Sequence, residues 1–224
     1  TQKVDVEKST VSKVKPGDVF KYTIEIVKNC TDQKLDNFTL TDILPKQVRL
    51  QSLSTGTYNQ DVKYSVEFQT NTNNEWRVWK KDLNTTANYY LNLPKDLKQG
   101  EYITVFRFCF GIVDGRYSSV VAPEYEVKVL ENGAGVLNNK IELTALIDGE
   151  TISDKDETNT PIETPKIPEK DHPKEPGRKE TEDIRIVEYH PHVNTGDMTN
   201  PVIWFGIAGI TGSICLAVRK QKKK

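Results

Sequence analysis

The feature that most constrains the fold is the alternation of apolar and polar residues along several short segments. Between residues 19 and 27 every second residue is apolar: Phe20, Tyr22, Ile24 and Ile26. The same alternation recurs in segments that contain Val4 and Val6; Phe38 and Leu40; Tyr64, Val66 and Phe68; Phe106, Phe108, Phe110 and Ile112; Tyr125, Val127 and Val129; and Leu137, Ile141 and Leu143. A period of two indicates half-buried strands, and no segment has the pattern of an amphipathic helix. The sequence therefore predicts an all-β sandwich over residues 1–150.

Residues 151–191 have a different composition, in which proline and charged residues replace the apolar rows. The prolines between residues 151 and 190 are Pro161, Pro165, Pro168, Pro173 and Pro176. Such a segment buries too little apolar surface to fold, and both proline and charge extend it. We predict a disordered Pro/Glu/Lys linker that acts as an extended spacer. The alternative is a disordered segment that has no spacing role.

Residues 201–218 form an uninterrupted run without charge, and the basic tail 219–224 follows it. As a helix the run would span about 27 Å, close to the thickness of a bilayer core. Basic residues stay on the cytoplasmic side of a membrane. We therefore expect one C-terminal transmembrane helix, with residues 1–200 facing outward.

The segment 192–197, which stands just before the apolar run, reads His-Val-Asn-Thr-Gly-Asp. A Thr-Gly pair followed by an acidic residue, an apolar run and a basic tail resembles the cell-wall sorting signal of Gram-positive surface proteins. The resemblance implies that a sortase transpeptidase cleaves between Thr195 and Gly196 and passes the chain to peptidoglycan or to a neighbouring pilin subunit. The motif departs from the family's Leu-Pro-x-Thr-Gly pattern, because His192, Val193 and Asn194 occupy its first three positions.

A second interpretation of the same C-terminal segment is a permanent anchor, as in a single-pass type I membrane receptor. The lysines of the tail would also serve as a dilysine retrieval signal. Three Asn-x-Thr tripeptides, which begin at Asn29, Asn37 and Asn84, would serve as glycosylation acceptors in such a protein. Cleavage at the Thr195–Gly196 bond separates the two interpretations.

The first part of the chain carries a second resemblance. Lys8, the segment 15–24 (Lys-Pro-Gly-Asp-Val-Phe-Lys-Tyr-Thr-Ile) and the segment 38–45 (Phe-Thr-Leu-Thr-Asp-Ile-Leu-Pro) resemble a repeated immunoglobulin-like domain of bacterial surface proteins. They are also similar to the fimbrial domains that form intramolecular isopeptide bonds. The resemblance covers residues 3–150 and implies an immunoglobulin-like β-sandwich in a structural, adhesive or pilin-like surface protein.

Three polar residues continue apolar rows and are the candidate site. Lys8 continues the row of Val4 and Val6, Asp42 continues that of Phe38 and Leu40, and Asn139 lies between Leu137 and Ile141. Burial lowers the pKa of a lysine and gives a neutral amine nucleophile, and an aspartic acid can polarise an amide and shuttle protons. We predict that Lys8 attacks the side chain of Asn139, with Asp42 as proton shuttle. The alternatives are a solvated Lys8 at a strand end, an Asp42 that caps a turn, and an inward Asn138 in place of Asn139.

Composition and spacing argue against other classes of function. The net charge of −1 gives no case for nucleic-acid binding. We expect no cofactor, no metal and no enzyme active site, because the chain has no nucleophile–His–acid set and no Gly-rich phosphate loop. Cys30 and Cys109 could pair, but the chain has too few cysteines for a disulfide-rich module. The first residue is Thr1, so we expect a fragment or a processed form with further domains upstream, and the sequence names no host ligand.

Overall fold

The computed structural model describes residues 2–163, and within that part of the chain all regular structure is β. The strands are β1 (Val4–Lys8), β2 (Val19–Asn29), β3 (Leu35–Ile43), β4 (Val48–Ser54), β5 (Thr57–Tyr58), β6 (Lys63–Thr70), β7 (Arg77–Asn84), β8 (Tyr90–Asn92), β9 (Ile103–Val113), β10 (Ser119–Val121), β11 (Glu124–Val129), β12 (Val136–Ile147) and β13 (Glu150–Pro161). The predicted all-β fold class is confirmed.

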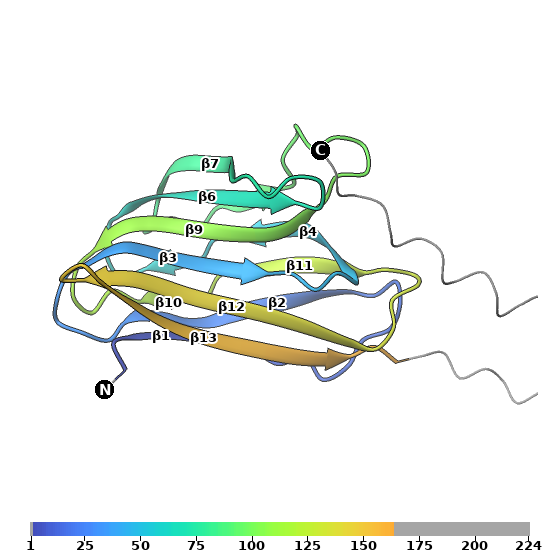
Figure 1. Ribbon diagram of the computed structural model, residues 1–224, viewed down its shortest axis with the longest axis horizontal. Helices are drawn as coiled ribbons and strands as arrows, with labels where there is room; N and C mark the ends of the chain where they lie inside the picture. Colours follow the sequence, from blue (N-terminus) through green and yellow to red (C-terminus); the bar gives the residue numbers. More distant parts are fainter. Residues whose placement is uncertain (1, 164–224) are drawn as a thin grey trace, which may run out of the picture. The chain divides into compact units, whose positions relative to one another are not determined.

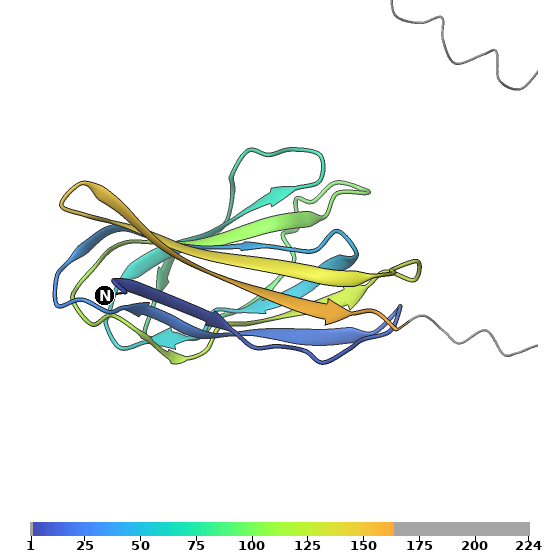
Figure 2. The same cartoon turned by 60° about the horizontal axis from the view of Figure 1, so that its bottom comes forward.

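Two sheets make up the sandwich. One has the order β1-β2-β11-β4-β8, and the other has the order β13-β12-β3-β9-β6-β7. A two-stranded ribbon of β10 and β5 accompanies them. Figures 1 and 2 show the two layers with their strands running roughly along the same direction. The alternating apolar rows of both sheets pack against each other in one buried cluster. This packing is favourable because it removes the apolar face of each strand from water.

Strand β13 extends past the predicted domain boundary, because residues 151–161 were expected to begin the extended spacer. The strand pairs with β12 along its whole length, from Glu150 opposite Ile147 to Pro161 opposite Val136. A tight turn at Asp148 and Gly149 joins the two strands, and both residues have positive φ angles, of 52° and 81°. An Asp-Gly pair is a strong hairpin signal, so the sequence does indicate the turn that leads into β13.

The more buried positions of β13 are mostly polar, so the apolar pattern of the sequence does not predict this strand. Two of them, Asp154 and Asp156, connect the edges of the two sheets. The Asp154 Oδ2 atom accepts a hydrogen bond of 3.0 Å from the backbone N–H of Val6, and the Asp156 Oδ2 atom accepts one of 2.8 Å from that of Lys8. These N–H groups lie on the edge strand β1, so the aspartates satisfy donors that an edge strand otherwise leaves exposed.

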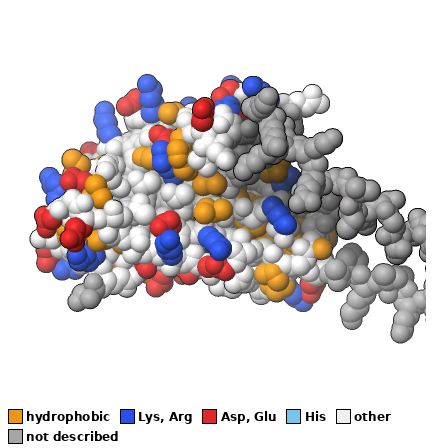
Figure 3. Space-filling view, viewed as in Figure 1, with side chains coloured by type: hydrophobic (Ala, Val, Ile, Leu, Met, Phe, Trp, Pro, Cys, Tyr) orange, Lys and Arg blue, Asp and Glu red, His pale blue; other side chains and the backbone are white. Residues whose placement is uncertain are grey.

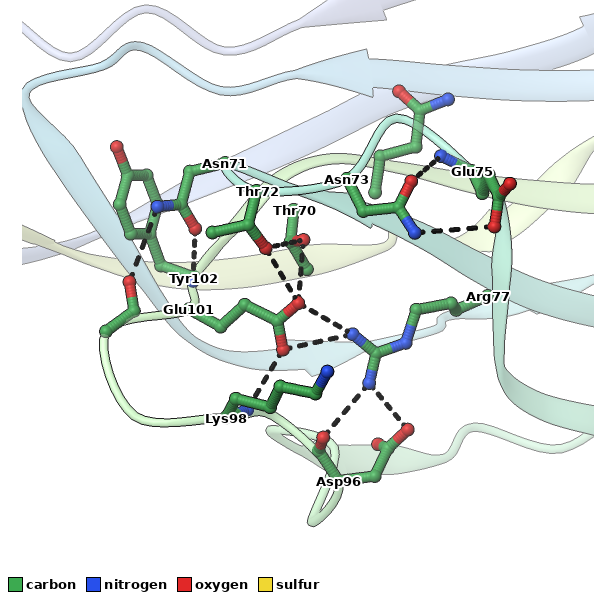
Figure 4. A network of polar contacts seen from close by, with 12 residues as sticks. Thr70, Asn71, Thr72, Asn73, Glu75, Arg77, Asp96, Lys98, Glu101 and Tyr102 are labelled. Carbon is green, nitrogen blue, oxygen red and sulfur yellow. Dashed lines mark hydrogen bonds and ion pairs between the residues drawn. The ribbon is translucent and has the colours of Figure 1, made fainter.

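A second polar network joins β6 and β7 to the loop before β9, with Glu101 at its centre (Figure 4). Glu101 accepts hydrogen bonds from the hydroxyls of Thr70 and Thr72 at 3.1 and 3.0 Å, and from the backbone N–H of Lys98 at 2.9 Å. The Arg77 Nη1 atom donates to both carboxylate oxygens, at 3.1 Å each. The network fixes a long loop that has no strand of its own.

These contacts predict a pH dependence. The hydrogen bond from the Lys98 backbone, helped by Arg77 and the two threonines, lowers the pKa of Glu101 from 4.5 to about 2. A lowered carboxylate pKa stabilises the folded state fully above pH 4.5, and the stabilisation is lost as the pH falls toward about 2. Urea unfolding should therefore show Glu101→Gln to be less stable than the native chain at about pH 6, with the difference shrinking at about pH 2.5. The exposed-site variant Glu7→Gln is the control, and a difference for Glu101→Gln that is independent of pH would contradict this account.

The outer surface of the domain carries interspersed charges of both signs, and Figure 3 shows one such face. Cross-strand pairs between β12 and β13 include Lys155 with Glu142 at 3.0 Å and Lys140 with Glu157 at 3.5 Å. These side chains are solvent-exposed, so each pair contributes little to stability.

The C-terminal predictions fall mostly outside the structure. Among residues 2–163 there is no helix with the length and apolar character needed to cross a bilayer. The expected transmembrane helix at 201–218, the basic tail and the remaining part of the spacer lie outside the described residues.

Candidate functional site

Lys8, at the end of β1, points its side chain into the sandwich. The residue follows Val4 and Val6 on the buried face of the strand, and its side chain is completely buried. Its strand partner is Ile24, at a point where the register of β1 against β2 shifts. The Lys8 ammonium lies over the rings of Tyr22 and Tyr125, 4.6 and 4.5 Å from their centroids. The amine therefore has aromatic walls in place of water.

Asp42 lies on β3, which is an inner strand of the six-stranded sheet. Its neighbours across the sheet are Ile141 on β12 and Phe106 on β9, and it has no solvent exposure. The Asp42 Oδ2 atom forms a buried ion pair with the Lys8 Nζ atom. The burial of Asp42 follows from its phase with Phe38 and Leu40, which are also fully buried. The turn-capping alternative for Asp42 is thereby wrong.

Asn139 on β12 completes the group. Its Nδ2 atom donates to Asp42 Oδ1 at 2.8 Å and to the backbone carbonyl of Ile43 at 2.9 Å. Asn139 has no solvent exposure, whereas the Asn138 side chain makes exposed contacts with Glu157 and Asn159 on β13. The inward asparagine is therefore Asn139. Asp42 bridges the two others, holding Lys8 on one carboxylate oxygen and Asn139 on the other.

Tyr125 on β11 is a member of the site that the sequence did not reveal. Its hydroxyl lies 3.0 Å from Asn139 Oδ1 and 3.0 Å from each oxygen of Asp42, and it accepts a hydrogen bond from Lys8 Nζ. Sequence alternation placed Tyr125 in a core row with Val127 and Val129. No sequence signal singles out Tyr125, because its ring alone accounts for a place in that row.

The electrostatics of the site follow from burial. Desolvation lowers the pKa of Lys8, while the charge of Asp42 and its hydrogen bond oppose that shift. Desolvation also raises the pKa of Tyr125 well above its ordinary value, and the nearby Asp42 carboxylate raises it further. The ring of Phe106 packs edge-on against that of Tyr125, with centroids 5.0 Å apart. The site is thus a dry polar cluster in which burial weakens the preference of the Lys8 amine for its charged form and favours a neutral Tyr125 phenol.

The remaining predictions concern the sorting motif, the two cysteines and metal binding. The sorting residues His192, Val193, Asn194, Thr195 and Gly196 lie outside the described residues. Cys30 and Cys109 are both free thiols. In the described part of the chain no three histidine, cysteine or carboxylate side chains are grouped as a metal site.

No family model and no curated protein matches the chain. Solved structures that it resembles include domains of bacterial surface proteins and a family 123 glycoside hydrolase from Clostridium perfringens. One is the collagen-binding subdomain of the Enterococcus faecalis surface protein ACE, with 10% identity, coverage of 70% of this chain and 95% of the other, and a TM-score of 0.34. Another is the collagen-binding domain of a Staphylococcus aureus adhesin, with 10% identity, coverage of 68% and 99%, and a TM-score of 0.32. A third is the C-terminal domain of the Streptococcus pyogenes antigen I/II-family protein AspA, with 18% identity, coverage of 69% and 46%, and a TM-score of 0.33.

Proposed function

We propose that this chain is a structural or adhesive stalk, or a pilin-like subunit, of a Gram-positive cell surface, built on an immunoglobulin-like β-sandwich with a self-formed isopeptide bond between Lys8 and Asn139. The observation that carries the proposal is the fully buried cluster of Lys8, Asp42 and Asn139. A buried ammonium and carboxylate cost free energy to desolvate, and their pairing often stabilises less than apolar side chains of similar volume. A cluster of this composition is therefore better explained by chemistry than by stability.

The reaction needs no group beyond those present. Asp42 takes a proton from the Lys8 ammonium, and the neutral Nζ atom attacks the Asn139 Cγ atom. A bond forms between Nζ and Cγ, and the bond between Cγ and Nδ2 breaks. Asp42 passes this proton to Nδ2, which lies 2.8 Å from its Oδ1 atom, so that nitrogen leaves as ammonia. Nζ then gives up a second proton to Asp42, which ends as a neutral carboxylic acid. The product is a neutral amide, which removes the cost of the buried charges.

The bond would join the two sheets covalently, because β1 belongs to the five-stranded sheet and β12 to the six-stranded one. Tension applied through the chain ends would then pass through the bond and bypass the sheet hydrogen bonds between residues 8 and 139. That property suits a stalk that holds a cell to a surface. The reaction occurs once per chain, so the proposal does not make the protein an enzyme with turnover.

The proposed anchoring rests on the sequence of residues 192–224. A sortase would cleave between Thr195 and Gly196, after the apolar run and the basic tail had held the precursor at the membrane. The acceptor would be peptidoglycan or a neighbouring pilin subunit. The protein would therefore be exported and displayed on the cell wall.

The anchoring is tested by incubating the full chain with purified sortases of different classes and an oligoglycine nucleophile. We expect a product that ends at Thr195 and carries the nucleophile, detected by mass, and no product from Thr195→Ala. A native chain that every sortase leaves intact would contradict the proposal and would favour a membrane receptor with a permanent anchor.

The crosslink is tested by a pair of neighbouring substitutions. Asn139→Ala removes the acceptor, whereas Asn138→Ala removes an exposed amide. The bond would close a loop from residue 8 to residue 139, which stabilises the fold by about 5 kcal/mol through the entropy of the unfolded chain. Asn139→Ala should therefore unfold at lower urea concentration than Asn138→Ala. It should also migrate more slowly than the native chain on a reducing, denaturing gel, because an open chain is less compact. Equal mobility of all three chains would contradict the proposal.

A further inference from the structure

We propose that Tyr125 is a catalytic residue of this self-crosslinking reaction, in which its hydroxyl donates a hydrogen bond to the oxyanion that forms on Asn139 Oδ1. The inference rests on the proposed function and adds a role that the Lys8, Asp42 and Asn139 side chains leave unfilled. When Nζ attacks Cγ, the amide oxygen gains negative charge, and a dry site without a donor would not stabilise it.

The position of the hydroxyl fits that role. It lies 3.0 Å from Asn139 Oδ1, while the Asn139 Nδ2 atom faces Asp42. The leaving nitrogen and the developing oxyanion therefore have separate partners, Asp42 for the nitrogen and Tyr125 for the oxygen. The Lys8 Nζ atom is hydrogen-bonded to the same hydroxyl, so nucleophile and amide are neighbours around it.

The single proton of the hydroxyl has two competing acceptors. Both oxygens of Asp42 lie 3.0 Å from the Tyr125 hydroxyl oxygen, as does Asn139 Oδ1. While Asp42 is a carboxylate it is the stronger acceptor and holds the proton. Once Asp42 has taken the proton of Lys8, it is neutral, and the Tyr125 proton turns to the amide oxygen. The oxyanion donor thus becomes free in the same step that makes the lysine nucleophilic.

A comparison with the other buried tyrosines shows that the fold does not itself require this contact. The hydroxyls of Tyr22, Tyr58, Tyr64 and Tyr117 are all buried, and none has a hydrogen-bond partner among the described residues. The sandwich therefore tolerates buried phenols without partners, and Tyr125 differs in touching the reacting atoms. Because burial raises its pKa, Tyr125 stays protonated and able to donate.

Tyr22 provides the matched control. Its ring lies 5.3 Å from that of Tyr125, and the Lys8 ammonium lies over both rings at similar distances. Tyr22→Phe and Tyr125→Phe each remove one buried hydroxyl from the same aromatic wall. Only Tyr125→Phe removes a donor to the amide oxygen.

The experiment follows bond formation in the full chain as it is made. Native chain, Tyr125→Phe and Tyr22→Phe are synthesised in a cell-free system, quenched in acid at intervals, and scored by intact mass for the loss of ammonia. Loss of one oxyanion donor slows a reaction by about 100-fold or more. We expect a slowing of that order for Tyr125→Phe, with Tyr22→Phe reacting at the native rate.

The outcomes separate this inference from the proposed function. A Tyr125→Phe chain that loses ammonia at the native rate overturns the catalytic role and leaves the crosslink intact. A native chain that never loses ammonia overturns the proposed crosslink itself. Should Tyr125→Phe fail to fold by circular dichroism, 3-fluorotyrosine placed at position 125 keeps the ring and hydroxyl but makes the phenol more acidic. We then expect a changed rate, and a rate equal to that of the native chain overturns the role.

Discussion

A Lys8→Met chain pulled by its two ends should extend much further than the native chain before it resists again. In the crosslinked native chain, only the residues before Lys8 and after Asn139 can unravel, because the bond carries the force past the rest. Without the bond, the segment from 8 to 139 also unravels, and at 3.3–3.6 Å per residue it adds on the order of 440 Å. Single-molecule force spectroscopy on the full chain measures this difference directly.

The substitution is chosen to preserve packing, since methionine has a flexible apolar side chain that fills the space of the lysine stem. Asp42 keeps its hydrogen bonds to Tyr125 and Asn139. Lys21→Ala is the control, because Lys21 forms an exposed ion pair with Glu124 at 3.3 Å and should leave the extension unchanged. A native chain that releases the whole domain would contradict the account.

Asp42→Ala should be the most destabilising single substitution in the site. It prevents bond formation by removing the proton shuttle, and it leaves the Lys8 ammonium buried without its carboxylate. An uncompensated buried charge costs about 3–5 kcal/mol. The free energy of unfolding in urea measures that loss.

Comparing the double variant Lys8→Met/Asp42→Ala with Asp42→Ala isolates the effect of the unpaired Lys8 charge, because neither variant can form the bond. Removing both charges leaves nothing unpaired, so the double variant should be more stable than Asp42→Ala alone by about 3–5 kcal/mol. Equal stabilities would mean that Lys8 reaches water when Asp42 is absent. In that case the buried position of the amine would not be imposed by the fold.

The sequence predicted the faces of the strands that carry the site, because strand side chains alternate strictly. Lys8, Asp42 and Asn139 each stand two residues from a buried apolar neighbour on the same strand, and the structure places all three side chains in the core. Which strands lie side by side depends on the topology, which the alternation does not reveal. The proximity of these three side chains was therefore inferred from the resemblance. The role of Tyr125 in the site could not be predicted, because an aromatic ring in an apolar row is expected simply to pack in the core.

Irregular backbone is one reason why other parts of the fold could not be predicted from the sequence. Ile112 was expected on the same face as Phe110, but Gly111 has a positive φ of 71° and Ile112 is exposed, while Val113 is buried in its place. A bulge shifts the alternation by one residue and cannot be read from hydrophobicity alone. Strand β13 was missed for a different reason: Asp154 and Asp156 face a strand edge, where hydrogen bonds to backbone N–H groups replace apolar packing.

The measurement that tests the central claim most directly is the intact mass of the purified full chain, followed by digestion and peptide mapping. The account predicts a mass lower than that of the sequence by one ammonia, about 17 Da, and one branched peptide in which Lys8 is joined to Asn139. A mass equal to that of the sequence, with Lys8 and Asn139 recovered in separate unmodified peptides, would contradict it.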